Sequence, residues 1–192
     1  MKHRSSQIVF AHWNERRAGR ALPERAEIDP GAIREGLSDT FILAFNQLSA
    51  HPFRLAGTRV CALFGGELKG RPFLPLWKRE AGPTISDMMH SMADESIGLV
   101  AGVAASTARG DTIELELLLL PLRHWGRSHL RLIGALSPLS APYWLGVHPV
   151  RALALGEHRF LGAGLDGPPP LLRPDAVPRQ RHGLTVYDGG QA

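Results

Sequence analysis

The residues that could do chemistry in this chain are few and widely separated. It has nine histidines and one cysteine among 192 residues. His124 and His129 flank one expected hairpin loop, His148 and His158 flank another, and no HxH or HExxH motif brings histidines together. A single cysteine allows neither an internal disulfide nor a cysteine metal cluster. The sequence therefore predicts no metal site.

Cys61 is the strongest nucleophile by residue type, and it lies in an apolar stretch with Val60, Leu63 and Phe64. We expect a small buried thiol, because a reactive cysteine needs a nearby cation to lower its pKa and Arg59 is adjacent only in sequence. No GxSxG elbow, P-loop or Rossmann glycine fingerprint occurs. The sequence predicts no catalytic residue and no enzyme.

Composition narrows the class of partner. The net charge is +4, but the arginines are scattered and form no basic stripe with interleaved aromatic residues, so a nucleic-acid partner is not expected. The densest apolar stretch, 115–122, is interrupted by Glu116 and Pro121, and no run reaches the roughly 18 residues of a membrane helix. The first residues lack the apolar core of a signal peptide. We expect a cytoplasmic protein without membrane insertion.

The pattern divides the chain into three parts. Residues 1–28 hold an amphipathic helix, expected over 6–18 with Ile8, Val9 and Trp13 on one side, followed by a loop. Residues 29–161 form the main domain. Residues 162–192 are rich in Gly, Pro and Arg and are expected to be a tail with a short extended segment near its end, at 184–187.

Within the main domain the pattern predicts an antiparallel sheet. Asp29-Pro30 is typical of a helix start, with Ile33 and Leu37 expected on the buried face of that helix. Strands are expected at 40–45, 53–56, 97–107, 112–122 and 128–136, with a further short hairpin around Gly156. A helix should begin at Thr84, whose spacing to Asp87 resembles a capping box. Five antiparallel strands with helices on one face make an α+β fold.

The strand over 112–122 has two different ends. Ile113, Leu115, Leu117 and Leu119 alternate with Thr112, Glu114 and Glu116, so its first half should have a wet face. Leu118, Leu120 and Leu122 make the second half apolar on both faces. We expect the N-terminal helix to cover that outer side.

Several segments resemble one family. They are EIDP at 27–30, FRLAGTRVCALFGGELKGRPFLPLW at 53–77, ELELLLLPL at 114–122, IGALSPLSAPYWLG at 133–146 and LTVYDGG at 184–190. The chain resembles the single-domain PAS proteins of α-proteobacteria, the PAS_5 group, over about residues 6–161 and the extreme C-terminus. The resemblance implies a PAS fold, a sensory or regulatory role and homodimerisation, and it implies no reaction.

In PAS proteins the short helices and the sheet form a cup that can hold a small molecule. By pattern, the wall of that cup would be made by Phe45, Leu55, Val60, Cys61, Phe64, Phe73, Trp77, Met88, Met92, Val103, Leu117 and Leu132. The same residues would equally make a dry core, and no cofactor is identified by the sequence.

Two cofactor types known from PAS sensors can be compared with these residues. Haem sensors use a histidine on the longer helix, where His90 lies, but Ile85, Met88, Met89 and Met92 cluster on one side of that helix and His90 lies nearly opposite. We expect a surface histidine. Flavin photosensors use a cysteine in an NCRFLQ-like helix, and the RVCALFG segment around Cys61 lacks both the asparagine and the glutamine.

Two functional hypotheses follow. In the first, a ligand-responsive sensor passes a small-molecule or cellular signal to a protein partner. In the second, a ligand-free PAS module acts by dimerisation or scaffolding. The expected interface in either case is an apolar surface of helix and outer sheet formed by Ile8, Val9, Trp13, Leu118 and Leu120.

Overall fold

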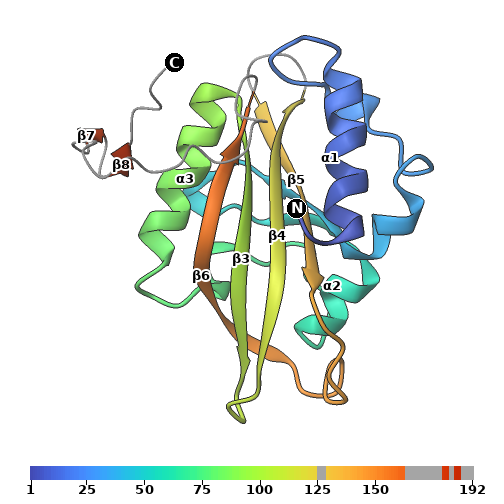
Figure 1. Cartoon of the computed structure of the whole chain (residues 1–192), viewed down its shortest axis with the longest axis vertical. Helices are drawn as coiled ribbons and strands as arrows, with labels where there is room; N and C mark the ends of the chain where they lie inside the picture. Colours follow the sequence, from blue (N-terminus) through green and yellow to red (C-terminus); the bar gives the residue numbers. More distant parts are fainter. Residues whose placement is uncertain (125–128, 163–178, 182–183, 187–192) are drawn as a thin grey trace. The chain divides into compact units, whose positions relative to one another are not determined.

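A computed structural model describes residues 1–124, 129–162, 179–181 and 184–186. The chain divides into two compact units, Met1–Gly162 and Ala163–Ala192. The first unit is built on a six-stranded antiparallel sheet with the order β2-β1-β5-β4-β3-β6, and its helices lie on both sides of that sheet (Figure 1).

The order of the elements agrees with the sequence pattern except after Asp29, where a 3-10 turn replaces the expected α-helix, and after Val150, where one long strand replaces a hairpin. The helices are α1 (Arg4–Arg17), α2 (Thr58–Leu63) and α3 (Gly82–Glu95), with short 3-10 turns η1 (Arg25–Glu27), η2 (Arg34–Asp39), η3 (Gln47–Ser49) and η4 (Leu74–Leu76). The strands of the sheet are β1 (Thr40–Ala44), β2 (Phe53–Ala56), β3 (Gly98–Thr107), β4 (Thr112–His124), β5 (His129–Pro138) and β6 (Val150–Leu161).

The sixth strand corrects the prediction of five strands and a separate short hairpin. β6 runs without a turn from Val150 to Leu161 and pairs with β3 along most of its length. The register shifts opposite Gly102, where a Cβ on Gly156 would lie 3.0 Å from the Gly102 carbonyl oxygen. Glycine there favours the close approach of two backbones in a bulge and does not mark a turn.

The sheet separates two hydrophobic clusters. Its inner face packs against α2, η4 and α3, and the predicted stripe of Ile85, Met88, Met89 and Met92 is buried there. Its outer face packs against α1 through Val9 and Trp13. Figure 1 shows α1 and α3 on opposite sides of the strands. The prediction that the N-terminal helix covers the outer ends of the central strand is confirmed, because Leu118, Leu120 and Leu122 lie in that second cluster.

Three local expectations were wrong. Glu116 is buried, because its carboxylate accepts hydrogen bonds from the backbone N–H groups of Lys2 and His3 at the start of the chain. Leu37 is exposed, since its segment is a 3-10 turn whose period differs from that of the expected α-helix. Helix α3 begins at Gly82, with a proline in its first turn and no side-chain cap.

The second unit contains a short antiparallel pair, β7 (Arg179–Arg181) with β8 (Leu184–Val186). The extended segment predicted at 184–187 corresponds to β8, and Tyr187 lies outside the described residues. Apart from Gly162 and β7, the rest of the expected tail also lies outside them.

Candidate functional site: an apolar cup and its rim

The residues predicted to line the cup lie in one buried cluster between the sheet and the short helices. Nine of these twelve residues are buried there, and two more, Phe45 and Cys61, are half-buried against it. Only Leu55 is misplaced, with 43% of its surface exposed. Leu55 pairs with Ile42, which belongs to the outer cluster, so the β-register places both on the far side of the sheet.

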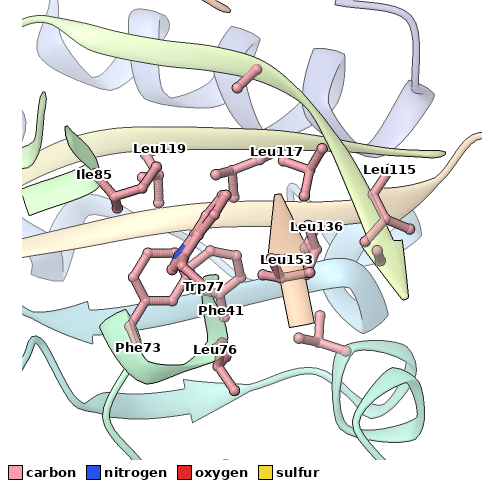
Figure 2. Close-up of a cluster of buried hydrophobic side chains, with 14 of the residues drawn as sticks. Phe41, Phe73, Leu76, Trp77, Ile85, Leu115, Leu117, Leu119, Leu136 and Leu153 are labelled. Atoms are coloured by element: carbon pink, nitrogen blue, oxygen red, sulfur yellow. The ribbon is translucent and has the colours of Figure 1, made fainter. Parts of the chain in front are cut away.

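Aromatic rings form the centre of the cup (Figure 2). The Phe73 ring lies 6.0 Å from Phe41, 5.8 Å from Phe53 and 5.8 Å from Trp77, measured between ring centroids. Three of these four contacts in the cluster, including Phe41 with Phe53 at 5.5 Å, are edge-to-face. Such pairs contribute about 0.5–1.5 kcal/mol each beyond the burial of their surface.

Phe41 was not among the predicted cup residues, although the strand that contains it was correctly predicted. Its ring occupies space left by Gly134 on the neighbouring strand β5, with which it pairs. A Cβ on Gly134 would lie 2.3 Å from the Phe41 ring, so only glycine fits. Leu153 was also missed, because it belongs to the strand that was predicted as a hairpin. Figure 2 shows both beside Trp77.

One polar atom inside the cup has no partner. The Trp77 side chain is buried, and its indole Nε1–H makes no hydrogen bond with any described residue. An unsatisfied buried donor costs roughly 1–3 kcal/mol. The indole N–H of Trp77 is therefore a candidate donor for an acceptor atom of a ligand in the cup.

The rim of the cup carries two histidines in contact with Phe45. The His51 and His90 rings lie 5.1 Å and 5.3 Å from the Phe45 ring and 6.1 Å from each other. His90 is half-buried and its Nδ1 lies 2.7 Å from the Ser86 carbonyl oxygen. The expected surface histidine is thus part of a packed aromatic group, because Phe45 reaches the side of α3 away from the methionine stripe.

His51 is buried, and its environment keeps it neutral. Its Nδ1 accepts a hydrogen bond from the Asn46 backbone N–H at 3.2 Å, so the ring proton is on Nε2, which has no partner among the described residues. Burial is the main cause that lowers the pKa of His51 to about 4, and the neighbouring His90 lowers it further.

Cys61 lies on α2 at the edge of the cup and is less buried than predicted. Its Sγ lies 3.8 Å from the Ala56 carbonyl oxygen and 3.8 Å from a carboxylate oxygen of Glu67. The pKa of Glu67 is lowered, first by the hydrogen bond from the Lys69 backbone N–H and then by those of Leu68 and Cys61. The nearest charged partner of the thiol is therefore an anion and not the cation that a reactive thiolate needs.

A buried carboxylate joins the cup to the outer helix. Asp39, at the end of η2, accepts a 2.6 Å hydrogen bond from the Ser5 hydroxyl of α1. The Arg59 guanidinium of α2 pairs with the same carboxylate, with Nε 2.8 Å from Oδ1 and Nη2 3.0 Å from Oδ2. Charge-assisted bonds of this kind are the stronger ones in proteins. The first turns of α1 and α2 are thus held by one group.

The predicted interface residues are brought together, but within a single chain. Val9, Trp13, Leu118 and Leu120 are buried in the outer cluster, and Ile8 is partly buried against it. The Trp13 Nε1–H donates a 2.8 Å hydrogen bond to the Pro121 carbonyl oxygen. The contact of helix on sheet is therefore made by the chain with itself, because the outer apolar end of β4 needs cover in every copy.

The described part of the chain offers neither a metal centre nor a membrane-spanning helix. No group of three or more His, Cys, Asp or Glu side chains there could hold a metal ion. None of the helices in the described ranges is long and apolar enough to cross a membrane.

Comparison with known proteins adds the family. A model of the PAS_5 family, described as a PAS domain, matches residues 1–137, which is more than half of the chain. The chain belongs to the PAS_5 family of PAS domains. The taxonomic group expected from the resemblance has no counterpart in this match.

Solved structures with a similar arrangement include light-oxygen-voltage (LOV) domains. One, from work on a flavin analogue in a LOV domain, has a TM-score of 0.46 and 16% identity over 59% of this chain and 85% of that chain. The light and dark structures of the blue-light photoreceptor Aureochrome1 LOV have TM-scores of 0.43 and 0.45, each with 18% identity. They cover 58% and 59% of this chain, and 89% and 83% of theirs. Among curated proteins, none matches.

Proposed function

We propose that this PAS domain is a sensory or regulatory module, without catalytic activity, that transmits a small-molecule or cellular signal to a protein partner. The observation that carries the proposal is the connection of the apolar cup to the outer helix through Asp39. Ser5 of α1 and Arg59 of α2 both bind this carboxylate. A change of the cup wall at α2 would thereby alter the anchoring of α1, whose surface a partner or a second copy would contact.

A ligand that fills the cup would act by favouring one of two arrangements of this wall. It can shift the equilibrium only by the difference of its affinity for the two. The unpartnered indole N–H of Trp77 supports the proposal, because a ligand with an acceptor atom would satisfy that buried donor. Small, mostly apolar molecules with one or two acceptor oxygens or nitrogens are the class we propose.

A ligand-free interaction module is the second candidate function. The four-ring contact of Phe41, Phe53, Phe73 and Trp77 favours it, since rings at these spacings already pack as a core. In this reading the domain acts in the cytoplasm as a homodimer or scaffold.

Native mass spectrometry of freshly purified protein, followed by denaturing analysis of released compounds, tests both candidates. We expect a stoichiometric small molecule that is lost in the Trp77→Phe variant, which keeps the ring packing but removes the N–H. An apo dimer would instead establish the interaction module. An apo monomer without a captured compound would contradict both.

A further inference from the structure

The outer face of the sheet carries two arginines beside its edge strand. Arg131 on β5 pairs with Ala44 on β1, and both side chains lie on the outer face because their neighbours Leu132 and Leu43 belong to the inner core. On the other side of β1, Arg54 lies in a bulge of β2, between Phe53 opposite Leu43 and Leu55 opposite Ile42.

Arg54 is exposed, whereas the inner side of β2 is closed by the core, so its side chain is on the outer side with Leu55. β1 lies between the two strands, and its residue paired with Arg131 is Ala44, a small side chain on the same face. The sheet thus places two guanidinium groups on the two strands that flank one alanine.

Among the described residues, no charged partner accompanies either arginine. Neither Arg54 nor Arg131 forms an ion pair or a side-chain hydrogen bond with any described residue; the ion pairs of the described chain involve Arg4, Arg16, Arg20 and Arg59 and the histidines His12 and His148. Arg131 is also half-buried. Its pKa is lowered by burial and then by the charge of Arg54, although a guanidinium stays protonated.

A half-buried cation next to a like charge is unfavourable unless an anion neutralises it. Arginine forks bind carboxylate and phosphate oxygens in a bidentate manner, which a lysine cannot do. We propose that Arg54 and Arg131 form a binding site for an oxyanion, either a carboxylate or a phosphate group, on the outer face of the sheet beside the exposed Leu55.

The site is separate from the cup, since the sheet lies between them. The exposed Leu55 next to the charges means that an anionic group with an adjacent apolar portion would match the surface better than a bare ion. Inorganic anions should therefore bind weakly and serve as probes of the site.

The test measures the melting temperature of the full-length chain at pH 7 in sodium phosphate, in sodium succinate and in sodium chloride at equal ionic strength. Phosphate, succinate or both should raise the Tm above the value in chloride, by about 2–4 °C at several times the Kd. Binding of phosphate alone would identify a phosphate site, and binding of succinate a carboxylate site; both outcomes support the proposal.

Variants show where the anion binds. Arg54→Gln and Arg131→Gln should each remove most of the anion-specific increment, whereas Arg151→Gln, at an exposed arginine of β6, should retain it. Arg131→Gln should also raise the Tm in chloride, because it removes an uncompensated charge. The proposal is overturned if the unmodified chain shows no increment over chloride, or if Arg54→Gln keeps it. Arg54 is exposed, so its variant decides the question even if Arg131→Gln does not fold.

Discussion

Single residues in this protein are used in ways that their type alone does not indicate. His51 is a neutral core group, Glu116 binds two backbone N–H groups at the start of α1, and Asp39 holds two helices. Each of these side chains accepts at least one hydrogen bond in its buried position, from the backbone or from a neighbouring side chain. These polar side chains therefore serve to position the elements around them.

The lowered pKa of His51 predicts a loss of stability in mild acid. The unfolded chain binds a proton at a pKa near 6.5, whereas the folded protein does so only near 4, so the unfolded state binds more protons between these values. The stability that this histidine contributes is complete above about pH 6.5 and is lost as the pH falls toward 4. The total loss is about 3 kcal/mol.

Urea denaturation at pH 4.5, 5.5 and 7 measures this effect. His51→Asn is the matched control, because the asparagine oxygen can accept the Asn46 N–H and asparagine tolerates the positive φ of 54° at this position. We expect the variant to show a clearly smaller loss between pH 7 and 4.5. Equal losses in the two proteins would mean that another group causes the pH dependence.

Among the elements, helix α1 determines how much of the outer face of the sheet is accessible. The Val9 and Trp13 side chains of α1 are buried against β4 and β5, and the hydrogen bond from Trp13 to Pro121 fixes the helix at the end of the long central strand. The chain's own helix thus covers the outer apolar end of β4, as the sequence pattern predicted.

Trp13→Ala should therefore lower the free energy of unfolding, by about 3–5 kcal/mol, because it removes a large core side chain. Trp13→Phe should cost less, since it keeps most of the packing and loses one hydrogen bond. Chemical denaturation measures both, and light scattering measures the mass in parallel. If Trp13→Ala lowered the mass and left a stable monomer, the helix would be bound to a second copy and the intramolecular packing would be disproved.

Of the two units of the whole molecule, Met1–Gly162 is the one that contains the hydrophobic core. Both hydrophobic clusters consist of residues from this unit, with Leu161 as their last member. The family match ends at residue 137. Strand β6, the edge strand beside β3, therefore lies after the matched residues.

A chain of residues 1–162 should consequently fold with one cooperative transition and the Tm of the full-length protein, as measured by calorimetry. A chain ending at residue 149 lacks β6 and should have a lower Tm, since Val150, Leu153 and Leu161 leave the core. If the two truncated chains melted at the same temperature, β6 would not belong to the cooperative unit.

The sequence by itself determined the alternation of the strands, the methionine stripe of α3 and the family. These features depend on periods of 2 and 3.6 residues and on contiguous segments, and both can be read along the chain. Eleven of the twelve predicted cup residues came together for this reason.

Only the tertiary structure decided which face Leu55 occupies, how Gly134 admits Phe41, and that β6 is one strand. A bulge or a shift of register moves side chains to the opposite face without any change in the local pattern. The influence of the Arg54 charge on Arg131, and the binding of Asp39 by Ser5 and Arg59, likewise join residues far apart in sequence. The fold brings these groups near one another, and no spacing along the chain records that distance.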